Sequence, residues 1–423
     1  NVTDGTSVEF SLTMGASTED GRGNITAYAS VRDNEAVLQR DRDYSACALS
    51  PTDRTQGGVD TNIRDPSFGC GGSGTSATGY FSDFGLNDNS SVGPDGVAGT
   101  GDDVPDTNPL PSFAFTAEGN EFRDFGANDL YNFGPLNYYQ RPDTRYTLGA
   151  MGHYELSEAA DVYTQLMFSD YDSTAQIAPG GAFGESGTVN CDNPLMSAQQ
   201  LAAIGCNIAA DPDGDATNGN NAQVPFYILR RNVEGGGRQD TFRTDSFRGV
   251  LGVRGAITEN WSYDASAQYS KVKVENFTLN RFVLPRFLNA LDAVDSGLAD
   301  GDPLTGASGE VVCRSGDAGC VPYNVFANGG VEPGSDVLNY LQVPSLEIGN
   351  IEQEVYGASV TGDLGGIGLA SPLANDSIKV VFGVETRTDR LSTIPDVNLQ
   401  SGQLMGQGGA TTSLDGRVKV DDI

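Results

Sequence analysis

Apolar and polar residues alternate with a period of two along several stretches of the chain. In Val8–Met14 the even positions are apolar and the odd positions polar, and similar alternation occurs in Trp261–Tyr269, Tyr356–Thr361 and Lys379–Glu385. Successive side chains of a β-strand point to opposite faces of a sheet. Each stretch therefore predicts a strand with one apolar and one polar face. A soluble sandwich shows this pattern, and so does a membrane barrel with lipid outside and water inside.

The predicted strands pair into four hairpins with compact turns. They are Val8–Ala16 with Asn24–Arg32, Arg145–Glu155 with Asp161–Asp170, Ser246–Ile257 with Trp261–Val274, and Ile351–Asp363 with Ile378–Arg387. Strands of about nine to fourteen residues are long for a globular protein but suit a tilted membrane strand. The links between hairpins are far longer: they run roughly from Asp33 to Thr144, Tyr171 to Asp245 and Glu275 to Asn350. Short connections at one end and long ones at the other are typical of outer-membrane barrels.

The barrel interpretation assigns a side to each residue of these strands. We expect these residues to face lipid: Val8, Phe10, Leu12, Trp261, Tyr263, Ala265, Tyr356, Val360, Val380 and Phe382. We expect these to face the lumen: Glu9, Ser262, Asp264, Lys379 and Glu385. Aromatic residues near predicted strand ends suit a lipid boundary, although ordinary cross-strand packing would also explain them. They are Tyr146, Tyr154, Phe168, Phe247, Trp261 and Tyr269.

Composition narrows the possible functions. Hydrophobic residues make up 38% of the chain and glycine numbers 55, which favours turns and long loops over packed helices. The formal net charge of −32 repels phosphates, so nucleic-acid binding is excluded, while cations would be attracted. No apolar stretch is long enough for a transmembrane helix. Asn1 opens a polar segment, so no signal peptide is visible, and we expect a mature or partial chain.

Six cysteines occur as close neighbours along the sequence. The pairs are Cys47 with Cys70, Cys191 with Cys206, and Cys313 with Cys320. Zinc sites use tighter spacings with more Cys or His nearby, so disulfides formed in an oxidising compartment are the better interpretation. Sequential pairing in external loops is our prediction among the many pairings that six cysteines allow. Within the long links, apolar residues at helical spacing predict short helices from Arg286 to Asp295 and from Val331 to Leu341.

Several short stretches of the chain share a recognisable order and spacing. They are Asp20–Asn24 followed by Tyr28 and Arg32-Asp33, Arg42–Cys47, Asn137–Pro142, Ala175–Pro179, Arg230–Arg238 and the glycine-rich run 401–409. These stretches resemble TonB-dependent receptors of Gram-negative bacteria, in particular the subgroup common in Caulobacter-like and Xanthomonas-like bacteria. The similarity is scattered over nearly the whole chain, and the order and spacing of the stretches make it specific.

This resemblance implies an antiparallel transmembrane β-barrel of about 22 strands, plugged by an N-terminal domain. It implies active uptake of a scarce large solute, such as a metal chelate, a vitamin or an oligosaccharide, powered through the TonB complex. Neither the plug nor the short TonB-binding box is visible, so we expect residues 1–423 to be the barrel portion only. We therefore predict an open sheet with edges at Val8–Ala16 and Gly416–Ile423, completed by residues or chains outside this sequence.

The sequence offers no enzyme chemistry, no required cofactor and few binding residues. The single histidine, His153, lies in the middle of a predicted strand, so a structural residue facing the lumen is favoured over a catalytic one. Acidic loops resemble oxygen-rich calcium sites, with solvated loops as the alternative. Their candidate ligands are Asp95, Asp102, Asp103, Asp211, Asp213 and Asp215. Candidate solute-binding residues are Tyr131, Tyr138 and Tyr139, whose rings could stack on sugars or pack the loop, and Arg230 and Arg231.

Two other functions stay open at this point. The chain could belong to a structural, adhesive or passive porin-type barrel. It could also be a soluble, acidic, calcium-binding secreted β protein. A plug and TonB box in the full gene would favour the transporter, and extraction without detergent would favour the soluble protein.

Overall fold

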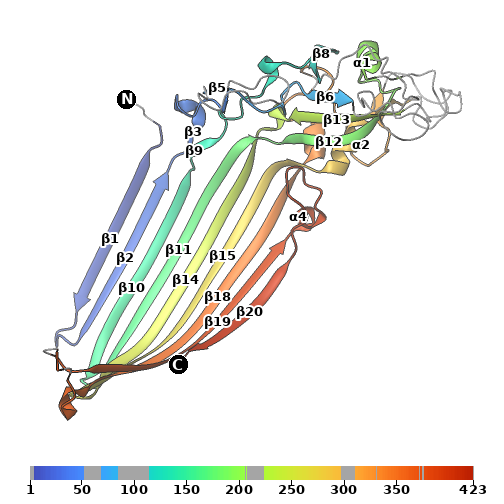
Figure 1. Ribbon diagram of the computed structural model, residues 1–423. Coiled ribbons are helices and arrows are strands. Elements are labelled where there is room, and N and C mark those ends of the chain that lie inside the picture. Colours follow the sequence, from blue (N-terminus) through green and yellow to red (C-terminus); the bar gives the residue numbers. More distant parts are fainter. Residues whose placement is uncertain are drawn as a thin grey trace.

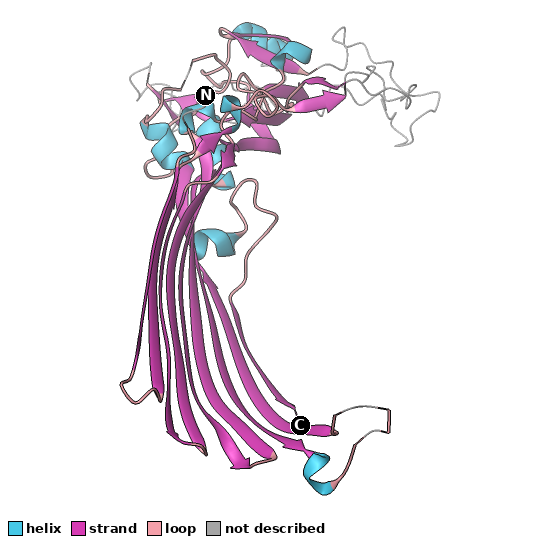
Figure 2. Ribbon diagram, turned by 90° about the vertical axis from the view of Figure 1, so that its left-hand side faces the viewer, coloured by secondary structure: helices cyan, strands magenta, loops and turns pink. Residues whose placement is uncertain are grey.

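The largest element of the computed structural model is a curved antiparallel sheet of nine strands (Figures 1 and 2). The structure describes residues 4–51, 68–83, 114–204, 206, 223–296, 310–329, 331–370, 372–373 and 376–422. In order across the sheet, the strands are β1 (Ser7–Ser17), β2 (Gly23–Asn34), β10 (Asp143–Ser157), β11 (Ala160–Pro179), β14 (Gly237–Thr258), β15 (Trp261–Phe282), β18 (Gln342–Asp363), β19 (Lys379–Pro395) and β20 (Leu414–Asp422). All four predicted hairpins lie in this sheet, which confirms the all-β class and the antiparallel pairing.

The strands β1 and β20 form the edges of the sheet, and in the described part of the chain they do not pair with each other. The prediction of an open sheet with these two edges is therefore confirmed; what completes the edges stays a prediction. The compact turns gather at one end of the sheet and the long links at the other (Figure 1). No helix among the described residues is long and apolar enough to cross a membrane.

The register sorts the side chains of the sheet as the sequence predicts. Residues paired across neighbouring strands point to the same side. One row of successive partners consists of Leu12, Ala29, Leu148, Phe168 and Phe247. Followed across all nine strands, the register places the ten residues predicted to face lipid on one side, here called the apolar face. The five predicted lumen residues lie on the opposite side, here called the polar face.

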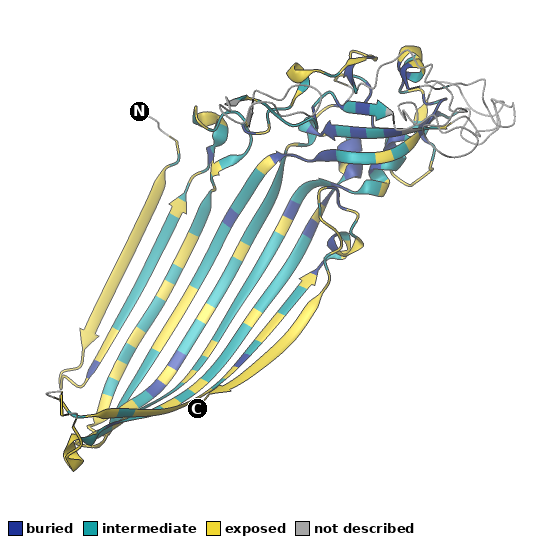
Figure 3. Cartoon of the chain, viewed as in Figure 1, coloured by how far each residue is buried: buried dark blue, intermediate teal, exposed yellow. Residues whose placement is uncertain are grey.

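Among the described residues, no second sheet covers the apolar face. Its large side chains remain between 40% and 66% exposed at Leu12, Leu148, Leu166, Phe168, Phe247, Leu251, Tyr356 and Phe382. Figure 3 shows the same contrast, with exposed and intermediate residues over the sheet and most buried residues beyond its end. The described residues therefore do not form the sandwich alternative, in which this face would be buried between two sheets.

The central strands extend further than predicted. β14 begins at Gly237 and not at Ser246, and β15 continues to Phe282 and not to Val274. Consequently Phe168, Phe247 and Tyr269 lie within their strands and not near strand ends. The alternation stops near these rings because charged residues such as Arg243, Lys271 and Lys273 enter the apolar face beyond them, although the backbone pairing continues. The true links between hairpins are correspondingly shorter.

The long links fold together at one end of the sheet into what we call the loop domain (the described residues of 37–142, 180–236 and 283–341). Its five-stranded sheet has the order β12 (Gly181–Asn190), β13 (Gln223–Arg231), β6 (Tyr80–Asp83), β7 (Phe115–Glu118) and β8 (Glu121–Asp124). All three links contribute to one hydrophobic core. Core side chains at most 2% exposed include Phe81, Ile228, Phe287, Leu291, Tyr323, Phe326 and Leu341.

Both helices predicted in the links are present. The first is α2 (Leu284–Leu291), which begins early because Pro285 suits a first helical turn, and ends early because Ala293–Asp295 forms β16. The second is α3 (Asp336–Leu341). The helices α1 (Ala198–Ala203) and α4 (Val397–Ser401) were not predicted. Small two-stranded pairs complete the structure: β16 with β17 (Val311–Cys313), β3 (Val37–Leu38) with β9 (Tyr138–Gln140), and β4 (Leu49–Pro51) with β5 (Phe68–Cys70).

All three predicted disulfides are present: Cys47–Cys70, Cys191–Cys206 and Cys313–Cys320. Each closes a loop within one link, with sequence separations of 23, 15 and 7 residues. They therefore restrain the loop domain and none crosses into the nine-stranded sheet.

Candidate functional site

A continuous row of hydrogen bonds crosses five strands on the polar face. Arg248 donates from Nη1 to Gln165 Oε1 at 3.2 Å and from Nε to Gln268 Oε1 at 2.9 Å. Gln268 Nε2 then donates to Gln353 Oε1, and Gln353 Nε2 donates to Asp389 Oδ1, both at 2.9 Å. Gln268 and Gln353 each accept on one side and donate on the other. The polar face is therefore a connected, hydrophilic wall.

A second polar group lies nearer the compact turns. His153 Nδ1 is 3.0 Å from Asp161 Oδ1, and Arg254 binds the other oxygen of Asp161 at 2.9 Å. Tyr163 donates its hydroxyl to Asp264 at 2.8 Å. His153 is on the polar face, in the middle of β10, as predicted. Its hydrogen-bond partner is a carboxylate, so His153 belongs to the connected polar groups of this face.

Two arginines stack on aromatic rings where the loop domain joins the sheet, in what we call the arginine cluster (Tyr131, Phe183, Arg231 and Arg238). The guanidinium carbon of Arg231 lies 4.9 Å from the centre of the Phe183 ring and 5.3 Å from that of Tyr131. The guanidinium carbon of Arg238 lies 5.0 Å from the Phe183 ring. Stacking of this kind favours a guanidinium over an ammonium group.

Backbone carbonyl groups hold both guanidinium groups in place. Arg231 donates to the carbonyl oxygen of Pro179, and Arg238 donates to that of Ala178, each at 3.0 Å. Burial, with the charge of Arg238 as a smaller cause, lowers the pKa of Arg231 to about 10. Arg231 therefore stays protonated at neutral pH although the cluster disfavours its charge.

Arg230, the neighbour of Arg231, belongs to a different and fully packed group. It is 4% exposed and binds Glu234 Oε1 at 2.5 Å and the hydroxyl of Tyr323. Burial raises the pKa of Tyr323 to about 12. These contacts tie β13 to the third link, so Arg230 has a structural position and not an open binding position.

The structure thus brings together only two of the five candidate solute-binding residues, Tyr131 and Arg231. Tyr138 lies in β9, and Tyr139 packs edge-on against Tyr44 with ring centres 5.6 Å apart.

Phe183 and Arg238 were missed by sequence reasoning. Arg238 could have been found, because it ends the family-like stretch that begins at Arg230, just after a glycine bend in which Gly236 has a φ of 79°. No local signal marks Phe183.

The six aspartates predicted as calcium ligands lie outside the described residues: Asp95, Asp102, Asp103, Asp211, Asp213 and Asp215. Within the residues that are described, no group of three or more His, Cys, Asp or Glu side chains could hold a metal ion. The calcium sites therefore stay predictions.

Comparisons with known proteins add no family to this picture. No protein-family model matches the chain, and a search of curated proteins found no similar sequence. Functional inference accordingly rests on the two-faced sheet and on the arginine cluster.

Proposed function

We propose that this chain forms part of the wall of an outer-membrane β-barrel, and that the protein takes up a large solute by TonB-dependent transport. The two-faced sheet carries this proposal. One face exposes large apolar side chains, while the other has rows of hydrogen-bonded polar side chains. A soluble protein rarely exposes so extended an apolar surface. Lipid on one side and water on the other would satisfy both faces.

The apolar face is long enough to cross most of the apolar band of an outer membrane. On β15 it extends from Trp261 to Tyr269, which is about 26 Å along the strand at about 3.3 Å per residue. A strand tilted by about 40° would then span about 20 Å of an apolar band that is about 25 Å tall in outer-membrane barrels. Beyond Tyr269 the same face carries ion pairs, such as Lys271 with Glu352 at 2.8 Å and Arg243 with Asp172 at 3.0 Å. Aromatic rings at both limits and charges beyond them are the arrangement expected at lipid–water boundaries.

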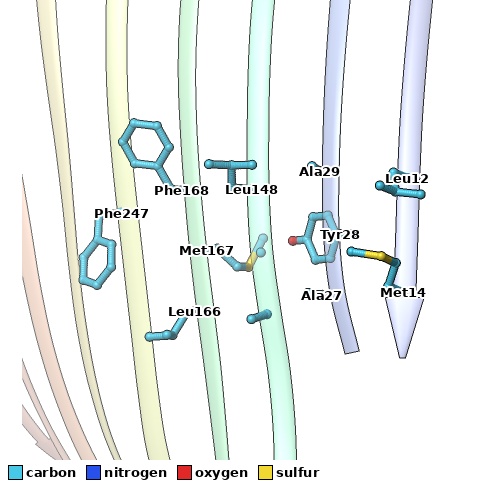
Figure 4. A pocket seen from close by; sticks show the side chains of 12 residues that line it. Leu12, Met14, Ala27, Tyr28, Ala29, Leu148, Leu166, Met167, Phe168 and Phe247 are labelled. Atoms are coloured by element: carbon cyan, nitrogen blue, oxygen red, sulfur yellow. The ribbon is translucent and has the colours of Figure 1, made fainter. Parts of the chain in front are cut away.

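A shallow apolar depression of about 400 Å³ lies on this face across β1, β2, β10, β11 and β14 (Figure 4). Its lining includes Leu12, Met14, Leu148, Leu166, Phe168 and Phe247. The lining is almost free of polar groups, so it suits alkyl chains of lipid better than a polar solute.

Two further features support uptake of a large solute over adhesion or a passive pore. An unpaired strand edge within lipid costs several kcal/mol for each exposed backbone group, so a barrel built on this sheet needs more than these nine strands and would be wide. The loop domain stands at the long-link end and is held rigid by a hydrophobic core and disulfides. A wide barrel with a structured domain at its mouth suits selective uptake, and the TonB complex is the partner that the family resemblance implies.

The membrane part of the proposal has a direct optical test, because Trp261 is the only tryptophan of the chain. The protein is reconstituted in vesicles whose acyl chains carry bromine atoms at graded depths. We expect the fluorescence of Trp261 to be quenched most strongly by bromines near the headgroups. Fluorescence that is insensitive to bromine at every depth would contradict a membrane position.

The transport part is tested in the bacterium that makes the protein, with and without its gene. Accumulation of labelled ferric chelates, cobalamin and oligosaccharides is measured before and after a protonophore collapses the proton gradient. We expect gene-dependent accumulation of one solute class that the protonophore abolishes. Gene-dependent entry that survives the protonophore would indicate a passive pore and would contradict TonB-dependent transport.

A further inference from the structure

The arginine cluster is a local excess of positive charge in a strongly acidic chain. Lysine and arginine number 25 against 57 aspartates and glutamates, so carboxylate partners are plentiful. Arg243, five residues after Arg238 on the same strand, is paired with Asp172 at 3.0 Å. Within the described residues, by contrast, neither Arg231 nor Arg238 has a carboxylate within ion-pair distance. The nearby carboxylate of Asp240 is instead paired with Arg281 at 3.4 Å.

Hydrogen-bond donors of the cluster are left over. Arg231 is 4% exposed, and its Nε atom is buried without an acceptor among the described residues. Its only acceptor in the described structure is the neutral carbonyl of Pro179. A buried cation without a counter-charge is costly, and a buried donor without an acceptor adds to the cost. Such a group is expected where a ligand supplies the missing partner.

The surroundings of Arg238 leave room for that ligand. Arg238 is only partly buried, and Gly406 lies beside it: a side-chain carbon at Gly406 would come within 3.6 Å of Arg238 Nη1. Gly408 and Gly409 have open space where a side chain would stand. The absence of a side chain at Gly406 therefore leaves space beside Phe183 and Arg238.

We propose that Arg231 and Arg238, both stacked against Phe183, bind an oxyanion group of the transported solute, a carboxylate or a phosphate. The planar guanidinium fork matches the paired oxygens of both groups. The stacked ring and the fixed carbonyl partners hold the forks in place before binding, which reduces the ordering cost. This assignment of a solute class rests on the proposed transport function.

Binding is tested by calorimetry on the purified protein in detergent, with citrate and inorganic phosphate as probes in a chloride buffer. We expect Arg238→Gln to weaken binding about tenfold or more, as the loss of a charged hydrogen bond predicts. Arg243→Gln is the matched control, because Arg243 lies on the same strand but on the opposite face and already has a carboxylate partner; we expect no change. No measurable binding of either probe, or equal weakening by both variants, would overturn the proposal.

A second variant separates binding from folding. Arg231→Gln is unsuitable for this purpose because it removes a buried group of the loop domain. Arg238→Lys is suitable because it keeps the charge and the partly exposed position but loses the planar guanidinium fork. We expect Arg238→Lys to weaken binding while hydrogen exchange of the loop domain stays unchanged. Full affinity in Arg238→Lys would contradict recognition by a guanidinium fork. Because binding is measured without a membrane or a proton gradient, its failure is distinguishable from failure of transport.

Discussion

The nine-stranded sheet and the loop domain use apolar residues in opposite ways. In the sheet, side chains such as Phe10, Leu251 and Phe382 remain 61–66% exposed, although the strands pair over long, regular registers. In the loop domain, residues such as Phe287 and Leu341 are completely buried (Figure 3). The loop domain has an interior of its own, whereas the sheet lacks one. The difference supports the proposal that the sheet lies in an apolar solvent, whereas the loop domain buries its own apolar surface.

The largest expected effect tests the interior of the loop domain. Glu234→Ala removes the carboxylate that binds Arg230 and leaves a buried charge without its partner. We expect the loop domain to lose about 3–5 kcal/mol of stability. Hydrogen exchange over residues 223–235 and 310–329, read by mass spectrometry, measures the loss.

A surface ion pair provides the control for this prediction. Asp172→Ala breaks the exposed pair with Arg243, which should contribute at most about 1 kcal/mol. Equal losses in the two variants would mean that the Arg230 group is no more important than a surface pair.

A smaller effect is expected from one charge placed on either face of the sheet. Ala267 lies on the apolar face between Leu251 and Tyr356, and its neighbour Ser266 lies on the polar face between two glycines, Gly252 and Gly357. Ala267→Arg should destabilise the protein in vesicles by about 2 kcal/mol, since the position lies between the middle and the border of the apolar band. Denaturant titration followed by Trp261 fluorescence measures the change.

Ser266→Arg is the matched variant for the other face. Gly357 leaves space for the longer side chain, whereas the ring of Tyr163 covers Gly252. Water should solvate the charge of an arginine that extends over Gly357. We expect a change well under 1 kcal/mol. Equal destabilisation by the two arginines would remove the distinction between a lipid face and a water face.

The smallest effect concerns alkaline pH. Burial raises the pKa of Tyr323 to about 12 in the folded protein, above the ordinary value of 10.0. Above pH 10 the unfolded state releases this proton while the folded state keeps it, so stability falls as the pH rises from about 10 towards 12. At pH 11 the expected loss is about 1 kcal/mol.

The variant Tyr323→Phe isolates this contribution, because phenylalanine has no proton to lose. We expect the loop domain of the variant to lose less stability between pH 9 and pH 11 than that of the original protein, as read by hydrogen exchange with rates corrected for pH. Parallel pH profiles of the two proteins would contradict a raised pKa at Tyr323.

Sequence reasoning was most successful in the sheet, where one residue in two is apolar. Alternation in Val8–Met14 and Trp261–Tyr269 predicted the strands, their faces and the two edges. It failed beyond Val274 on β15 and before Ser246 on β14, because charged residues such as Arg243 and Glu275 interrupt the apolar face there, while backbone hydrogen bonds, which carry no sequence pattern, continue the strands. The helix α1 was missed although Ser197 and Gln200 form a capping box at its start, because six residues are too few to show a helical period.

The amino-acid sequence alone determined the nine-stranded sheet with its two faces, the three disulfides and two helices of the links, since each depends on local periodicity or short spacing. Only the tertiary structure decided which linked segments form the five-stranded sheet, that Arg230 is a buried partner of Tyr323, and that Arg231 meets Arg238 and Phe183. These contacts join residues of different links and strands. Their physical cause is the burial of apolar surface from all three links in a common core, which no single stretch of sequence encodes.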